Sequence, residues 1–130
     1  MKKIIFRDSK FESMKTINRG RGVFAGEQIK KGEEIESCPV LILPISQEKH
    51  LEKTELKYYY FEWAKDKDAI ALGYGSLYNH SYKPNAEFLI SKKDQMIVIK
   101  ALTNIKKGEE IFFDYNGHNP SGDCVWFKVK

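Results

Sequence analysis

Residues 73–85 read GYGSLYNHSYKPN, and this stretch decides how the rest of the chain is interpreted. Its Gly, Asn, Ser and Pro residues are typical of a loop between two strands. Three tyrosines lie inside it, and loops on a rigid scaffold are where binding and catalytic residues concentrate. His80 could act as a general base, but Ser81 is its direct neighbour and Cys38 is remote in sequence. Without an activated nucleophile, a serine or cysteine hydrolase is disfavoured.

An internal repeat lies on either side of this stretch. The residues IKKGEEI occur at positions 29–35 and again at 105–111. Each copy follows a short apolar stretch and precedes another, and its Lys-Gly pair supplies a turn. The pattern predicts two similar strand–turn–strand units. Two copies are too few for a solenoid, so the repeat indicates a pseudo-symmetric β fold.

Most of the remaining chain also favours short strands. They are expected at residues 4–7, 11–17, 69–72, 86–90 and 95–100, with a hairpin turn at 92–94. One helix is expected at residues 46–57, which are rich in Glu, Lys and Leu and can be capped by Ser46. Its apolar face is thin, because Leu51 and Leu56 do not share a helical stripe. No linker divides the chain, so residues 1–130 are expected to form a single, mainly β domain.

Composition narrows the class of protein. The chain is 42% apolar and 31% charged, as globular proteins are. No apolar run approaches the ~20 residues of a membrane span, and the N-terminus lacks the ~7–15 apolar residues of a secretory signal. We therefore expect a cytoplasmic protein without a membrane partner. The net charge is +4, but the lysines are scattered and Arg is scarce, which favours a solvated surface over a nucleic-acid interface.

The potential metal ligands are few. The two cysteines, Cys38 and Cys124, form no CxxC pair, and the three histidines are far apart in sequence. A structural zinc site needs about four Cys or His ligands at close spacing. No metal is expected.

Three motifs in a fixed order carry a resemblance. Residues 20–25 read GRGVFA, residues 79–85 read NHSYKPN, and residues 109–116 read EEIFFDYN. Together they resemble the signature motifs of SET-domain protein-lysine methyltransferases, over roughly residues 12–118. The resemblance implies a β-clip-like fold of small twisted sheets with one short helix and a C-terminal pseudoknot. Residues 119–130 would be a closing segment.

The resemblance also implies which residues would be catalytic, which would bind the cofactor and which would line the lysine channel. Tyr115 would be the catalytic residue of the FDY motif. S-adenosylmethionine would be the cofactor and S-adenosylhomocysteine the product, bound by Gly20, Arg21, Gly22, Asn79, His80 and Tyr115. Phe113 would line the lysine channel with Tyr78, Phe88 and Trp126, and looser candidates are Tyr58, Tyr59, Phe61 and Trp63.

Such a channel would have to favour methyl transfer to a lysine amine. Methyl transfer needs a neutral amine, whereas a free lysine has a pKa near ~10.4. A desolvated aromatic channel next to a sulfonium disfavours the ammonium form, and the enzyme then contributes mainly in-line positioning. Phe113 stands where many SET domains have Phe or Tyr, and Tyr restricts methyl number. Phe therefore suggests that di- or trimethylation is permitted.

Departures from the family pattern leave alternatives. Ser76 stands where Arg is frequent, and Tyr82 stands where Cys is frequent. No cysteine-rich tail follows Tyr115, so the resemblance is to the minimal, zinc-free type of bacteria and viruses, whose substrate groove a homodimer could complete. The partner would be a lysine-containing protein. A eukaryotic host would leave a nuclear location open beside the expected cytoplasmic one. Two other functions remain: an inactive SET-like binding module, and a basic β-barrel that binds nucleic acid.

Overall fold

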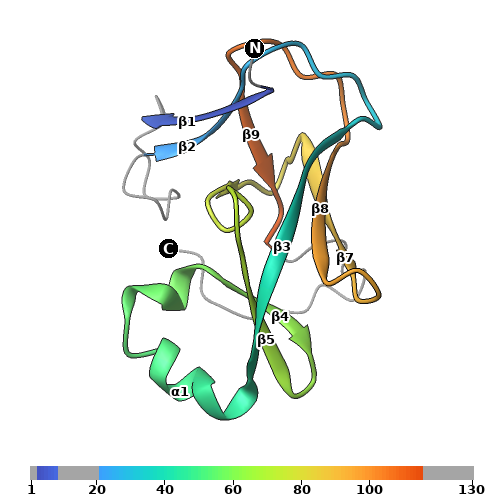
Figure 1. Cartoon of the computed structure of the whole chain (residues 1–130). Helices are drawn as coiled ribbons and strands as arrows, with labels where there is room; N and C mark the ends of the chain where they lie inside the picture. The colour runs from blue at the N-terminus through green and yellow to red at the C-terminus, as the bar shows by residue number, and fades with distance from the viewer. Residues whose placement is uncertain (1–2, 9–20, 116–130) are drawn as a thin grey trace.

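The computed structural model describes residues 3–8 and 21–115, and its framework is two small sheets (Figure 1). The first has the strand order β1-β2-β9-β6, and the second has the order β4-β5-β3-β8-β7. Strand bounds in the first sheet are β1 Ile4–Asp8, β2 Arg21–Ala25, β6 Asn79–His80 and β9 Glu110–Phe113. Those in the second are β3 Glu34–Pro44, β4 Tyr60–Ala64, β5 Lys67–Ala71, β7 Ala86–Ser91 and β8 Met96–Ala101. The predicted mainly β class is confirmed.

The predicted repeat is real, and its two copies face each other. Ile29 and Ile105 are fully buried and form an antiparallel bridge, in which each N–H donates to the other's carbonyl at 2.9 and 2.8 Å. Gly32 and Gly108 occupy the same left-handed turn position, with φ of 86° and 90°. The two similar turns therefore both lie close to this bridge. Strand β3 follows the first turn, and strand β9 follows the second.

The predicted helix over residues 46–57 is wrong. The structure has three short pieces there: η1 Ile45–Gln47, α1 Glu48–Leu51 and η2 Glu55–Tyr58. The thin apolar face explains the break, because Leu51 is buried while Leu56 remains 44% exposed. Thr54 then caps a new turn by accepting a hydrogen bond from the N–H of Leu56 at 3.1 Å. None of the helices in the described ranges is long and apolar enough to cross a membrane.

The other strands largely agree with the prediction, with small shifts in their bounds. The strand expected at residues 69–72 runs instead from Lys67 to Ala71 as β5. The turn at 92–94 is confirmed and extends to Gln95, which has a φ of 53°. Strands β4 and β6 were not predicted. The strand expected at 11–17 and the C-terminal threading beyond Tyr115 lie outside the described residues.

One apolar cluster joins the two sheets. It includes Val23 and Ile111 from the first sheet and Ile97 and Ile99 from the second, all fully buried. Strand β9 lies between β2 and β6, and its pairing with β6 is parallel. This insertion brings the end of the FFDY segment next to the NHS segment, which is what positions the site.

Candidate functional site

Asn79 is the point where three distant segments meet. Its side chain is fully buried, and Nδ2 donates to the backbone oxygen of Arg21 and to Oε2 of Glu110, both at 2.7 Å. Glu110 is itself only 5% exposed, so this carboxylate contact is made out of water. Hydrogen bonds to a buried charged group are worth more than neutral ones. The junction therefore ties the GRG, NHS and EEIFFDY motifs together.

Gly22 shows why the GRG segment needs glycine. A Cβ at this position would lie 2.1 Å from Oε2 of Glu110 and 2.7 Å from Nδ2 of Asn79. Neither atom belongs to a loose surface side chain, because both residues are buried. The resemblance implied that this glycine lies at the cofactor. In the structure it lets β2 approach the Asn79–Glu110 pair.

Asn85, at the end of NHSYKPN, fixes β9 in place. Its Oδ1 accepts from the N–H of Phe112 at 2.8 Å, and its Nδ2 donates to the carbonyl of Glu110 at 2.9 Å. One amide side chain thus replaces two strand-to-strand hydrogen bonds. The loop and the FDY strand are held in one register.

Tyr115 is held at both ends. Its backbone N–H donates to Nδ1 of His80 at 2.9 Å, and its hydroxyl donates to the carbonyl of Tyr78 at 2.6 Å. The side chain is buried, with 4% exposed. Burial first, and then the neighbouring Tyr59 and Glu110, raise the pKa of Tyr115 well above its usual value. Tyr115 is therefore a neutral, oriented hydroxyl.

His80 supports Tyr115 through its side chain. Since Nδ1 accepts the Tyr115 N–H, the ring proton belongs on Nε2 in this arrangement. The ring also packs against those of Tyr82 and Tyr115, with centroids 4.3 and 5.0 Å apart. Oδ1 of Asp114 lies 3.7 Å from Nδ1. These contacts make His80 a positioning residue for Tyr115, a role added to the expected binding of the cofactor.

An aromatic cluster surrounds Phe113, which is only 1% exposed. Its ring centroid lies 5.2 Å from Tyr78, 5.0 Å from Phe88, 6.3 Å from Phe61 and 5.8 Å from Tyr115. The expected channel residues Tyr78, Phe88 and Phe113 are therefore brought together, and Phe61 joins them.

The remaining candidates differ in their placement. Trp63 is buried in the core cluster, while Tyr58 and Tyr59 are half-buried. Gly20 and Trp126 lie outside the described residues. Ser76 closes the turn after β5, where Oγ accepts from the N–H of Ala71 at 3.1 Å and donates to its carbonyl at 3.2 Å.

Glu36 was missed by the sequence reasoning. Its Oε1 accepts from the hydroxyl of Tyr78 at 2.8 Å, and its Oε2 accepts from the N–H of Tyr74 at 2.9 Å. Burial, and after it the Glu36 carboxylate, raise the pKa of Tyr78 well above its usual value. Glu36 thus holds the residue whose carbonyl receives the Tyr115 hydroxyl. Glu36 and Glu110 look like surface residues in the sequence, and no local pattern distinguishes them.

The comparisons with known proteins show the family of this chain. The family model described as "SET domain" matches residues 20–116. A Schizosaccharomyces pombe relative named "Histone-lysine N-methyltransferase, H3 lysine-37 specific" is 36% identical, over 92% of this chain and 78% of that protein. The Caenorhabditis elegans "Histone-lysine N-methyltransferase mes-4" is 30% identical, over 84% of this chain but 15% of that protein.

Solved structures give the same result for the fold. A crystal structure described as that of a candidate histone methyltransferase from Plasmodium falciparum has a TM-score of 0.71 and 35% identity, covering 92% of this chain and 96% of that one. A humanized mutant of the Chaetomium thermophilum Polycomb Repressive Complex 2 has a TM-score of 0.67 at 22% identity, covering 91% of this chain and 16% of that one. The second likeness concerns the fold alone.

Proposed function

Since this chain belongs to the SET-domain family and is a protein-lysine methyltransferase, we propose that methyl transfer takes place where the segments around Arg21, Asn79 and Tyr115 meet. The observation that carries the proposal is the pair of short contacts, Asn79 to Arg21 at 2.7 Å and Tyr115 to His80 at 2.9 Å. These contacts support a single site that includes the described cofactor and catalytic candidates. The narrower expectation of a minimal, zinc-free bacterial or viral type stays a prediction.

The junction fits S-adenosylmethionine by the chemistry of its groups. This cofactor, when bound, supplies a methyl group on a positively charged sulfonium. Arg21 and the NHS segment offer backbone and amide groups, and Glu110 adds a buried carboxylate behind Asn79. Carbonyl and carboxylate oxygens suit a ligand that carries an ammonium and a sulfonium. We assign Arg21, Gly22, Asn79 and His80 to the cofactor side of the site.

The aromatic cluster forms the lysine side of the site. The rings of Tyr78, Phe88 and Phe113 exclude water, and an amine surrounded by them favours its neutral form because burial disfavours the charged one. Tyr115 is neutral and anchored to the carbonyl of Tyr78 at 2.6 Å. It therefore orients the amine and does not remove a proton from it as a phenolate would. Precise placement of the nucleophile is then the main contribution of the protein.

The substrate follows from the relatives by analogy. The S. pombe and C. elegans proteins are named as histone-lysine methyltransferases. We propose a histone or another basic protein as the substrate, and a nuclear location where the host has a nucleus. The cytoplasmic location expected from the sequence gains no support from these relatives.

The test is mass spectrometry of an acceptor protein after incubation with S-adenosylmethionine. Wild type should add one or more methyl groups to a histone, while Tyr115→Phe should slow transfer about tenfold or more, equivalent to ~1.4 kcal/mol. Tyr82→Phe is the matched control, because it removes a hydroxyl from a residue that is 67% exposed and whose ring also packs against His80. Full activity in Tyr115→Phe would remove Tyr115 from its role. Cofactor binding without any transfer by wild type would instead identify an inactive binding module.

Methyl number can be tested in the same assay. Phe113 packs among the rings of Tyr78 and Phe88 and lacks the hydroxyl that a tyrosine would place there. We expect wild type to produce di- or trimethyl-lysine and Phe113→Tyr to shift the product toward monomethyl-lysine. A wild type that yields monomethyl-lysine alone, unchanged by the substitution, would contradict this assignment.

A further inference from the structure

The side of β4, β5 and β3 that faces away from the core carries an unusual mixture of side chains. Alternate residues of these strands, such as Phe61, Ala69 and Ile42, pack into or against the core. The residues between them point to the other side. They form two cross-strand rows, here called the outer face: Glu62, Asp68 and Leu43 in one row, and Tyr60, Ile70 and Leu41 in the next.

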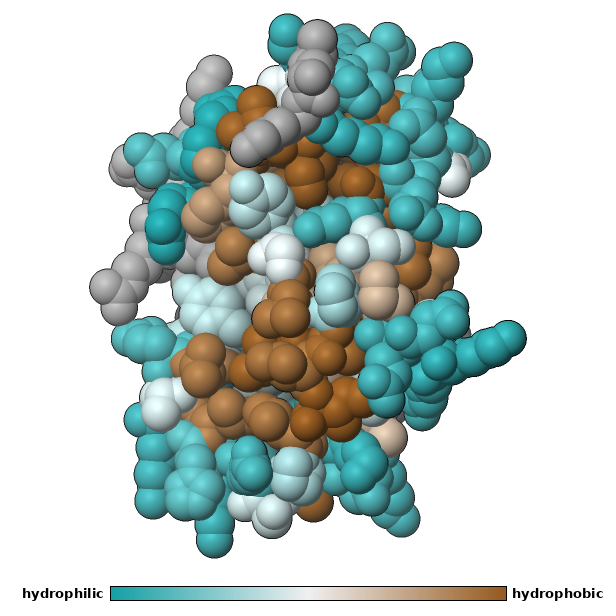
Figure 2. All heavy atoms as spheres, in the orientation of Figure 1, coloured by the Kyte–Doolittle hydropathy of each residue, from teal (hydrophilic) through white to brown (hydrophobic). Residues whose placement is uncertain are grey.

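One half of this outer face is apolar and exposed. Leu41 on β3 is 52% exposed, and Leu72, directly after β5, is 41% exposed. Ile45, which is 42% exposed, lies farther along and also lines the pocket described next. Figure 2 shows apolar side chains gathered over the part of the molecule where β3 pairs with β5. Single exposed apolar residues are ordinary, but a gathered patch marks a surface that other molecules contact.

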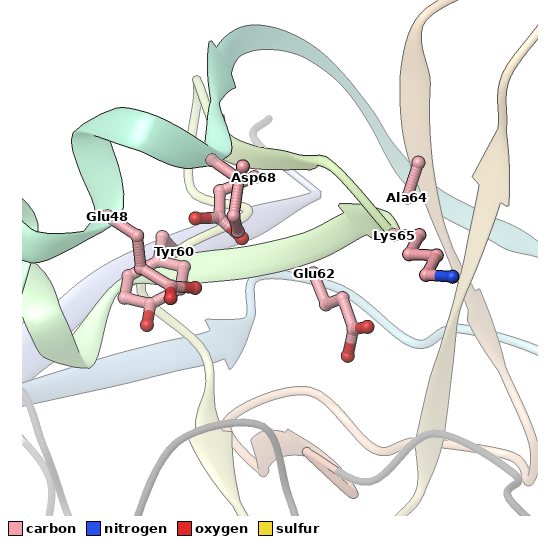
Figure 3. A pocket seen from close by; sticks show the side chains of 7 residues that line it. Glu48, Tyr60, Glu62, Ala64, Lys65 and Asp68 are labelled. Carbon is pink, nitrogen blue, oxygen red and sulfur yellow. The ribbon is translucent and has the colours of Figure 1, made fainter.

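The other half is an acidic pocket of about 210 Å³ (Figure 3). Its lining residues are Ile45, Glu48, Tyr60, Glu62, Ala64, Lys65 and Asp68. Figure 3 shows Glu48, Tyr60 and Asp68 grouped at one end, with Glu62 and Lys65 farther along β4 and the turn after it. Glu62 and Asp68 are direct cross-strand partners, an arrangement that like charges disfavour.

The buried side chain of Asp68 lacks a partner for one of its carboxyl oxygens. It is only 1% exposed, yet within residues 3–8 and 21–115 its Oδ2 has no hydrogen-bond partner. Its carboxyl shares a hydrogen bond with Glu48, so two acidic groups meet without a cation between them. Burial first, and then Glu48, Glu62 and Glu52, raise the pKa of Asp68 to about 7. An unpartnered buried carboxyl oxygen costs free energy, and a cationic partner that reached it would stabilise the charged form of Asp68.

The residues that line the pocket favour an organic cation over a metal ion. No group of three or more His, Cys, Asp or Glu side chains in the described part of the chain could hold a metal ion. Ile45, Ala64 and the ring of Tyr60 instead offer walls for an alkyl stem. We propose that this pocket is a docking site for an arginine side chain of a partner protein, whose neighbouring apolar residues cover Leu41 and Leu72. The planar guanidinium can bind the Glu48 and Asp68 carboxyls together, which a single ammonium cannot do as well.

The pocket is separate from the lysine channel. Tyr60 and Glu62 face the pocket, whereas Phe61 between them faces the aromatic cluster, 6.3 Å from Phe113. The two sites therefore lie on opposite sides of β4. Docking of arginine does not depend on methyl transfer, and it can be measured on a chain that transfers no methyl group.

The test is a fluorescence titration of the full chain with a short labelled peptide that has one arginine between two leucines. The same peptide with citrulline, which has the shape of arginine without its charge, is the matched control ligand. A lysine version separates guanidinium recognition from general attraction to acid. We expect the arginine peptide to bind best, and Asp68→Asn to weaken it ~10-fold or more. Glu34→Gln, an exposed carboxylate elsewhere on β3, should leave binding unchanged.

The pH dependence supplies a second readout. Asp68 must be ionised to bind a cation, and Glu48, Glu62, Glu52, Tyr60 and Lys65 are the other titratable groups around it. Affinity for the arginine peptide should therefore rise between about pH 6 and pH 8 in wild type and stay flat in Asp68→Asn, because the group titrates near 7.

Three results would overturn the proposal. They are equal binding of the arginine and citrulline peptides, unchanged binding in Asp68→Asn, and competition by a lysine substrate for the same site. Should Asp68→Asn fail to fold, Glu48→Gln removes the other carboxyl of the proposed pair, and its unchanged affinity would count against the pocket. Loss of methyl transfer with intact arginine binding would contradict the proposed function and leave the docking site standing.

Discussion

The two IKKGEEI copies have the same residues and nearly the same turn, yet they end in different environments. In both copies the turn N–H donates to an alanine carbonyl across the contact at 2.8 Å: Gly32 to Ala101, and Gly108 to Ala25. The last glutamate differs, because Glu34 is exposed while Glu110 is 5% exposed and binds Asn79. Local sequence determines the turn, but the neighbouring segments determine whether a residue becomes part of a site.

The largest expected effect is on the free energy of unfolding, and it tests whether the two repeat copies contribute equally to it. Ile29 and Ile105 are both fully buried and bond to each other. Ile29→Ala and Ile105→Ala should each lower the free energy of unfolding by ~2–5 kcal/mol, since each leaves a cavity at the same contact. Urea denaturation measures both. A difference between the two variants larger than the spread of repeated measurements would show that the symmetry does not extend to energetics.

A smaller effect concerns the turn glycines. Gly32 and Gly108 have φ of 86° and 90°, and an added Cβ would meet no atom within 4 Å at either site. Gly32→Ala and Gly108→Ala therefore test backbone strain without steric clashes, and each should cost ~1–2 kcal/mol. Thermal unfolding of the pair gives the comparison. Clearly unequal losses would mean that one turn relaxes and the other does not.

The smallest effect is electrostatic and belongs to the first copy. The Lys3 side chain, bonded to Glu33 at 2.7 Å, and the N–H of Lys30 lower the pKa of Glu33 below its usual value. A lowered carboxyl pKa adds stability above the unfolded-state value near 4.5, and this is lost as pH falls through the folded-state pKa. Glu33→Gln should therefore reduce stability slightly at neutral pH and not at strongly acidic pH. An NMR titration in which Glu33 shows an ordinary pKa would remove the effect.

The sequence patterns predicted some of these features and missed others for physical reasons. The repeat predicted both turns, since a Lys-Gly turn is a local property, and the three motifs predicted which segments meet. The helix over residues 46–57 failed because only Leu51 found a buried position. Glu36 and Glu110 were missed because a glutamate on a strand looks solvent-exposed until tertiary packing covers it.

The burial of Asp68 on the outer face likewise depends on tertiary packing. Asp68 lies in a sequence of ordinary surface character, KDKDAIA at residues 65–71, and nothing local indicates that it is buried. Asp68 lies opposite Glu62 because β4 pairs with β5, and it shares a pocket with Glu48 because of where α1 lies. Contacts of this kind arise from tertiary structure and have no periodic signal.

The most direct test of this account is the affinity for S-adenosylmethionine of a matched pair, Glu110→Gln and Glu34→Gln, measured by isothermal titration calorimetry on folded protein. These residues are the same letter of the two repeat copies, and only Glu110 holds Asn79, at 2.7 Å. The account predicts that Glu34→Gln binds like wild type and that Glu110→Gln binds ~10-fold more weakly or worse, a loss of ~1.4 kcal/mol. Equal affinities in the two variants would contradict the assignment of the Asn79 junction as the cofactor site.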